Sequence, residues 1–160
     1  MKPIIPVALA AMALVGCNPG GTKSAEPTYV PAHNIRELMT VVMEPQAQVF
    51  WNSTGTVMDE TGEHDLTPTT DEAWLRSQSA AATVAEMGNL MQTPLYTEGR
   101  GADWREFSAS LTQVGQLAEK AVIARDTEAM MEISMTMYNV CSACHRVYLP
   151  EAAAASTAPR

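Results

Sequence analysis

The residues with the clearest chemical potential lie near the carboxyl end, where Cys141-Ser142-Ala143-Cys144-His145 forms a C-x-x-C-H sequence. This sequence is the pattern of c-type haem attachment. On a helix, Cys141 and Cys144 face the same way, so their thiols can form thioethers with the two vinyl groups of one haem. His145 follows the second anchor, where its imidazole can ligate the iron. The sequence therefore predicts one covalently attached haem c, with His145 as an iron ligand.

Two other chemistries also use closely spaced cysteines. A thioredoxin-like pair opens a helix after a strand, where the helix dipole lowers the pKa of the first thiol. Here the motif closes a helical pattern, and no strand is predicted before it. A zinc site needs about four ligands. The only further candidate is His64, which lies among acidic residues in a predicted loop and is interpreted as solvated. Haem attachment is therefore favoured.

The second axial position of the iron has two methionine candidates. Met39 and Met43 lie one turn apart on a predicted helix, so helical periodicity does not separate them. Both can instead pack in the core, because methionine is a common core filler, and the iron then stays open. A thioether opposite His145 raises the reduction potential and suits an electron carrier. An open iron in an apolar pocket would bind nitric oxide or carbon monoxide.

Apolar residues at 3.6-residue spacing predict four amphipathic helices. They run from Asn34 to about Phe50 with a kink at Pro45, from Thr69 or Thr70 to before Pro94, from Asp103 to near Arg125, and from Asp126 to Pro150. Glutamates placed for capping boxes follow the first three starts, at Glu37, Glu72 and Glu106. Beta-branched runs are scarce, so the fold class is all-α. Four such helices describe a four-helix bundle with its site on inward-facing side chains.

Segments around these helices give weaker signals. In the second helix a stripe of small side chains, including Ala81, Ala85 and Gly88, lets a neighbouring helix or a flat cofactor approach closely. The connection from Asn52 to Pro68 is longer than usual and is expected to wrap over the bundle. Three residues are weak candidates for haem propionates and are better interpreted as solvated: Glu86, Asn89 and Arg100.

The amino-terminal residues have the composition of an export signal. Residues 1–16 combine Lys2 with a short apolar run, which predicts a signal peptide and is too short for a membrane span. Leu14-Val15-Gly16-Cys17 resembles a bacterial lipobox, which makes Cys17 the site of lipid attachment. The alternative is an ordinary signal cut after Ala25. Residues 17–33 are then a flexible, lipid-anchored tether, residues 34–150 the folded domain, and residues 151–160 a disordered tail. We expect a periplasmic protein anchored to a membrane.

The charge balance narrows the partners. The 160 residues contain ten Lys and Arg against 18 Asp and Glu, a formal net charge of −8. Nucleic-acid binding needs a basic patch and is not expected. The negative charge serves solubility or steers the protein toward a basic redox partner. No carboxylate pair or activated nucleophile stands out, so the chain is not expected to be an enzyme.

The chain resembles the class II c-type cytochromes, which include cytochrome c-prime and the low-spin c-556 group. The resemblance rests on C-x-x-C-H-x-x-Y from Cys141 to Tyr148 and on Glu37-Leu38-Met39. It extends through Pro45 and Trp51 to the stretches 70–74 and 85–91. It implies a cytochrome c-prime-like four-helix bundle, a one-electron carrier and a possible homodimer.

The same resemblance bears on the choice of ligand. In c-556 proteins the ligand methionine follows a leucine in the first helix, which implies Met39 as the sixth ligand. Many c-prime proteins carry a basic residue after the aromatic position, whereas here Leu149 follows Tyr148 and the nearby base is Arg146. This departure weakens the transfer of c-prime gas binding.

Overall fold

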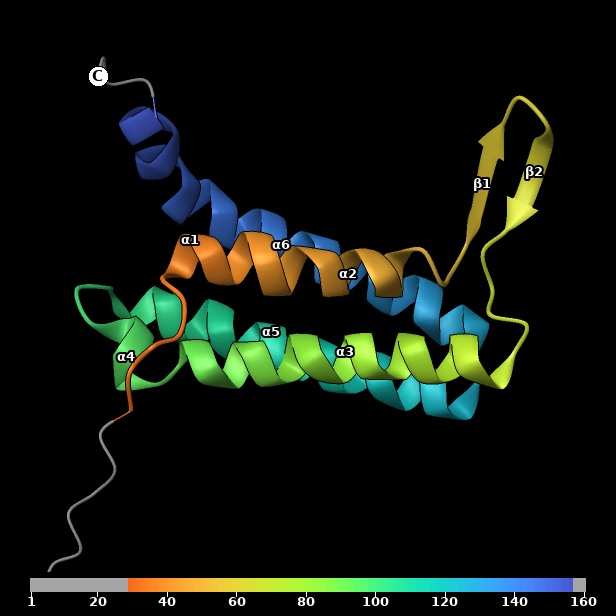
Figure 1. Cartoon of the computed structure of the whole chain (residues 1–160), viewed down its shortest axis with the longest axis horizontal. Helices are drawn as coiled ribbons and strands as arrows, with labels where there is room; N and C mark the ends of the chain where they lie inside the picture. Colours follow the sequence, from red (N-terminus) through yellow and green to blue (C-terminus); the bar gives the residue numbers. More distant parts are fainter. Residues whose placement is uncertain (1–28, 157–160) are drawn as a thin grey trace, which may run out of the picture.

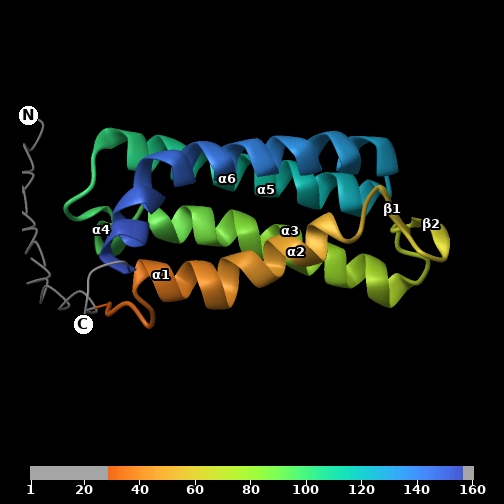
Figure 2. The ribbon, with the colours of Figure 1, turned by 90° about the horizontal axis from the view of Figure 1, so that it is seen from above.

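The computed structural model describes residues 29–156. The predicted signal peptide, the lipid-attachment residue Cys17 and most of the tether lie outside the described residues, as do residues 157–160. The described chain is mainly helical, as predicted for the all-α class, with one small two-stranded sheet. The long helical segments run side by side along the longest axis of the molecule (Figure 1; Figure 2).

The first predicted helix begins where its capping signal places it. It comprises α1 (Ile35–Glu37), a π-helix η1 (Leu38–Met43) and α2 (Glu44–Trp51). The Glu37 backbone N–H donates to the Asn34 side chain at 3.0 Å, and the Asn34 N–H donates to the Glu37 carboxylate at 3.1 Å. This reciprocal pair confirms the predicted capping box and fixes the start of the helix.

Pro45 acts through the turn that precedes it. A proline ring in a regular α-helix clashes with the carbonyl four residues earlier. The chain meets this constraint with a wider turn, in which the Glu44 N–H donates to the Met39 carbonyl, a bond between residues five apart. Residues five apart then share a face, so Leu38 and Met43 are both buried, at 3% and 6% exposure. Met39 is only half-buried.

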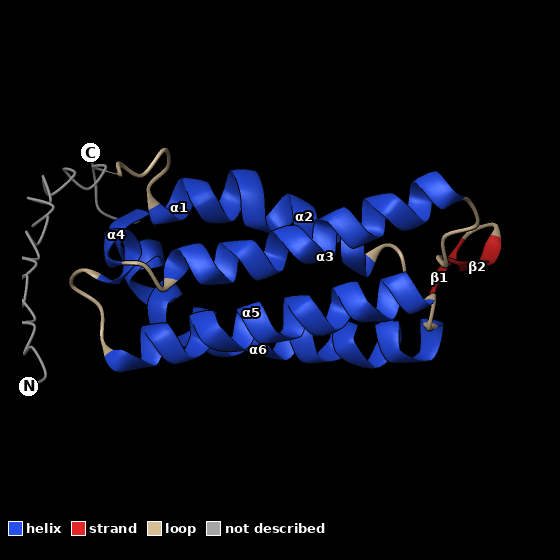
Figure 3. Ribbon diagram, turned by 90° about the horizontal axis from the view of Figure 1, so that it is seen from below, coloured by secondary structure: helices blue, strands red, loops and turns tan. Residues whose placement is uncertain are grey.

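The connection after α2 is a β-hairpin, and the prediction of a loop wrapping over the bundle was wrong. Strands β1 (Thr56–Asp59) and β2 (Gly62–Asp65) pair antiparallel, with Thr56 opposite Asp65. All eight strand residues are exposed, and Figure 3 shows the hairpin projecting at one end of the molecule. The Asp59 side chain accepts the Thr61 N–H at 2.7 Å and thereby holds the turn.

Helix α3 (Asp71–Met91) packs against α5 (Ala102–Ala124) at glycine contacts. A Cβ at Gly88 would lie 2.6 Å from the Thr112 backbone nitrogen, and one at Gly115 would lie 2.6 Å from the Ala85 nitrogen. The small-residue stripe therefore admits a neighbouring helix, which was one of its two predicted uses. Thr70 is the N-cap of α3, where its side chain accepts the N–H of Ala73, and the predicted box with Glu72 does not form.

The third predicted helix starts two residues earlier than expected. A short helix α4 (Pro94–Thr97) precedes α5. The N-cap of α5 is Gly101, which makes no side-chain hydrogen bond. The predicted capping box at Asp103 and Glu106 is therefore wrong, and Asp103 instead accepts a hydrogen bond from Tyr148. Arg125, in the left-handed conformation at φ 53°, ends α5 near the predicted position.

The last helix, α6 (Thr127–Ser156), starts as predicted but ends later. Asp126 caps it by accepting the N–H of Ala129 at 3.0 Å. The prediction that Pro150 stops the helix was wrong, because the alanines that follow favour helix strongly and a proline can kink a helix without ending it. The C-terminal turns bend away from the other helices (Figure 1). Residues 151–156 of the predicted disordered tail thus belong to α6.

The hydrophobic core lies between the long helices and includes residues of α6. Helix α3 packs against α2 and α5, and α5 packs against α6. The fully buried large side chains of the core come from several elements: Phe50, Val84, Met91, Val122, Met130 and Met137. Within residues 29–156, no helix has the length and hydropathy needed to span a bilayer.

Candidate cofactor pocket

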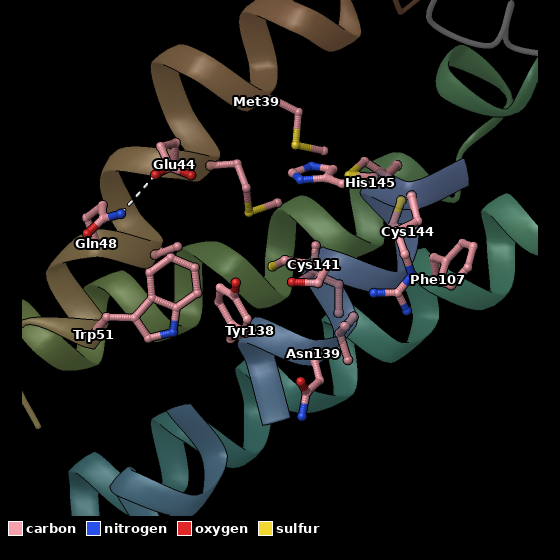
Figure 4. Close-up of a pocket in the computed structure, with 17 residues that line it drawn as sticks. Met39, Glu44, Gln48, Trp51, Phe107, Tyr138, Asn139, Cys141, Cys144 and His145 are labelled. Carbon is pink, nitrogen blue, oxygen red and sulfur yellow. Dashed lines mark hydrogen bonds between the residues drawn. The ribbon is translucent and has the colours of Figure 1, made fainter. Parts of the chain in front are cut away.

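A cavity of about 720 Å³ separates the first helical segment from α6. This volume lies in the range of small-molecule and cofactor sites, roughly 300 to 1,000 Å³. Helices α3 and α5 contribute Met91, Phe107 and Leu111 to its apolar wall. Figure 4 shows the surrounding side chains, which come from segments distant in sequence.

The pocket brings together the residues predicted to bind haem. Cys141, Cys144 and His145 line it from α6, and Met39 and Met43 line it from η1. The helical spacing explains the first three, because positions three and four residues apart share a face of α6. Cys17, the predicted lipid site, lies outside the described residues.

The two cysteines are free thiols in an environment that keeps them protonated. Burial, then the neighbouring Cys144 and Glu44, raises the pKa of Cys141 to about 11. Burial, then the charge of Asp103, also raises the pKa of Cys144. Redox-active cysteines of the thioredoxin type have lowered pKa values at a helix start. Here the motif lies late in α6, and the pKa values of both thiols are raised instead of lowered.

The two methionines differ in their surroundings. Met43 belongs to the buried core cluster, whereas Met39 is only partly buried and packs at the edge of that cluster. In Figure 4 the Met39 side chain extends from η1 toward the imidazole of His145 on the facing helix. The π-helical turn thus separates two residues that α-helical periodicity places on one face.

An aromatic pair joins α2 to α6 along one side of the pocket. The Trp51 indole N–H donates to the Ser134 carbonyl at 3.2 Å, and its ring meets Tyr138 edge-on with centroids 6.3 Å apart. Tyr138 was not singled out from the sequence. The signal was available, because Tyr138 precedes Cys141 by three residues and so lies on the same side of the helix.

A second aromatic pair secures the helix that carries the motif. Tyr148 meets Trp104 of α5 edge-on at 4.9 Å, and its hydroxyl donates to Asp103 at 2.9 Å. The Trp104 indole N–H donates in turn to the Met91 carbonyl at 2.8 Å. The Arg100 guanidinium stacks on the Trp104 ring at 4.4 Å. These contacts tie the turn after His145 to the wall of the pocket.

The weaker candidates lie elsewhere. Asn89 donates to Glu86 at 3.4 Å and accepts from Thr112 at 3.3 Å, so this pair faces α5 and does not line the pocket. Arg100 donates to the Tyr96 carbonyl at 2.7 Å, in addition to its contact with Trp104. His64 lies in the exposed hairpin, 3.1 Å from Asp59.

The donor set fits the covalent attachment of a c-type haem. Covalent attachment needs two thiols on one helical face beside an imidazole, and the pocket provides these together with a thioether on the facing helix. Within the described residues, no group of three or more His, Cys, Asp or Glu side chains is arranged to hold a metal ion.

Searches of family profiles, curated proteins and solved structures found no match to this chain.

Proposed function

We propose that this protein is an exported, lipid-anchored monohaem c-type cytochrome that carries one electron at a time. The observation that supports the proposal best is the pocket itself. It places the C-x-x-C-H thiols and His145 on one wall and the Met39 thioether on the other. Bound haem would supply a one-electron iron couple. The described helices are consistent with the four-helix bundle of class II cytochromes, which we propose as the fold.

The chain's own residues have separate roles in this proposal. Cys141 and Cys144 would anchor the haem edge, and His145 would ligate the iron from α6. Met39 would ligate the iron from η1, and a thioether ligand would raise the reduction potential of the haem. Phe107, Leu111 and the other apolar wall residues would exclude water from the bound haem.

Haem attachment is the decisive test. We expect the full-length protein, produced with a c-type haem maturation system, to retain haem after denaturing electrophoresis. The double variant Cys141→Ser/Cys144→Ser should lose this signal, because serine forms no thioether. Ser142→Ala, between the two cysteines, is the matched control and should keep it. Haem that remained attached in the double variant, or a wild type without covalent haem, would refute the proposal.

A further inference from the structure

Exposed apolar side chains form a line on α6 beside the pocket. Met131, Met135 and Tyr138 are 42%, 65% and 61% exposed, and their spacing of four and three residues places them along one side of the helix. Single exposed apolar residues are ordinary, whereas a contiguous group marks an interaction site. Tyr138 also lines the pocket, so this α6 stripe, defined as Met131, Met135 and Tyr138, ends at the pocket mouth.

Both segments that flank the mouth carry mainly acidic charge, and Arg146 of α6 is a basic side chain that lines the pocket. Residues 37–65, which include one wall of the pocket and the hairpin, contain no Lys or Arg. Their six acids are Glu37, Glu44, Asp59, Glu60, Glu63 and Asp65. Residues 127–145 of α6 also contain no Lys or Arg, and their acids are Glu128 and Glu132. Helix α5 carries both signs, including Arg105 and Lys120.

We propose that the α6 stripe is the docking surface for a basic one-electron redox protein whose apolar contact patch is ringed by Lys and Arg. The proposal rests on the proposed function, because it assigns the partner of the same pocket. Apolar contact would exclude water at the mouth, while Glu128 and Glu132 beside the stripe would pair with the basic ring. One electron would pass between the two redox centres, and no bond or proton need be exchanged.

The charge pattern selects this occupant over two others. A second copy of the chain would bring Glu128 and Glu132 against the same acids, and like charges across an interface disfavour association. An anionic membrane surface would be repelled for the same reason. A basic protein gains from both the apolar stripe and the surrounding carboxylates.

Binding can be measured without electron transfer. We would titrate the full-length holoprotein with zinc-substituted basic mitochondrial cytochrome c, a redox-inert probe, by calorimetry. Met135→Ser should raise the Kd about fivefold or more, the loss typical of truncating one apolar contact residue. Leu75→Ser on α3, where the side chain is 64% exposed, is the matched control and should leave the Kd unchanged. Glu132→Lys should also weaken binding, while Glu86→Lys on α3 should change it less.

The outcomes separate the two proposals. Equal Kd values for Met135→Ser and Leu75→Ser, or no binding of the probe by the wild type, would overturn the docking surface. Loss of self-association in Met135→Ser with unchanged probe binding would also overturn it and identify a second copy as the occupant. Haem content is measured by absorption in the same samples. Stripe-dependent binding in a protein without covalent haem would refute only the proposed function.

Discussion

At the scale of single residues, the two methionines of the first helical segment have different surroundings. Met39 and Met43 both reach the pocket, but only Met43 is deeply buried. A π-turn shifts the phase of the helix, and the less buried of the two, Met39, extends toward His145 in Figure 4. We therefore expect Met43 to contribute mainly to stability and Met39 to act as the proposed ligand.

Met39→Ala should remove the proposed sixth ligand. In the oxidised holoprotein we expect loss of the weak far-red sulfur-to-iron band, and the reduced protein should bind carbon monoxide faster. Met43→Ala should keep that band but lower the free energy of unfolding by about 2 to 5 kcal/mol, the cost of truncating a buried methionine. Absorption spectra and urea titrations measure the two effects.

A wild type that is already high-spin and quick to bind carbon monoxide would favour five-coordinate gas binding instead. A far-red band lost only in Met43→Ala would move the ligand to Met43 and leave electron transfer as the function. The two variants thus test the ligand and the function independently.

Tyr148 connects pH to the anchoring of α6. Burial and then the hydrogen bond to Asp103 raise the pKa of Tyr148. A tyrosine whose pKa is higher in the folded state stabilises the fold at pH values below about 10, its unfolded pKa. This stability is lost as the pH rises through the folded pKa, because the anion no longer donates to Asp103.

Tyr148→Phe should therefore lose less stability than the wild type between about pH 9 and pH 11, the range in which tyrosine ionises. Thermal unfolding of both proteins across this range gives the comparison. Tyr138→Phe, on the same helix, is the control and should keep the wild-type pH dependence. An identical alkaline slope for Tyr148→Phe and the wild type would mean that the Asp103 hydrogen bond does not contribute.

At the scale of elements, local signals predicted helix starts better than helix ends and connections. Asn34, Thr70 and Asp126 cap the helices as expected, because each has a side-chain acceptor three residues before a backbone N–H of the first turn. The start at Gly101 was missed because this cap has no side chain. The extension past Pro150 was missed because proline lowers helix propensity without excluding a kinked helix.

The hairpin and the π-turn needed more than apolar periodicity. The hairpin residues are all exposed, so no buried stripe marks them, and only the short Thr56-Val57-Met58 run and the turn before Gly62 indicate strands. The π-turn follows from how the chain relieves the clash at Pro45, which the sequence alone leaves as an unspecified kink. The site residues on α6 were predictable because their spacing is short and strictly helical.

The contact between α3 and α5 depends on glycine. Replacing this glycine by alanine should lower the stability of the protein, whereas helix propensity alone predicts an increase. Alanine normally favours a helix over glycine by up to about 1 kcal/mol. At Gly115 the added Cβ would lie 2.6 Å from the Ala85 nitrogen and 2.8 Å from its Cα. Gly115→Ala should therefore destabilise the protein by about 1 to 3 kcal/mol through overpacking.

Urea unfolding measures this effect, and Ser79→Ala at an exposed position of α3 is the control. The control should stay within about 0.5 kcal/mol of the wild type, as surface substitutions usually do. A stabilised Gly115→Ala would show that the two helices can separate without loss, contrary to the tight contact described for them.

At the scale of the whole molecule, charge is distributed unevenly around the pocket. Residues 37–65 and 127–145 carry acids without Lys or Arg, whereas Arg146 of α6 and helices α3 and α5 supply bases. Glu44 and Arg146 both line the pocket. A mainly acidic surface around a pocket attracts positively charged reactants and raises their encounter rate.

Small redox probes of opposite charge should reveal this asymmetry in the holoprotein. Reduction by hexaammineruthenium(II), a cation, should slow as salt rises from about 0.01 M to 0.1 M, because the screening length falls from about 30 Å to 10 Å. Oxidation by hexacyanoferrate(III), an anion, should accelerate over the same range. Stopped-flow absorption measures both rates.

Glu44→Gln removes an acid at the mouth and should reduce both salt dependences more than Glu106→Gln on α5, which changes the net charge equally. Equal effects of the two variants would mean that the net charge alone steers reactants. Rates that do not respond to salt would leave the acidic surface with no part in electron exchange.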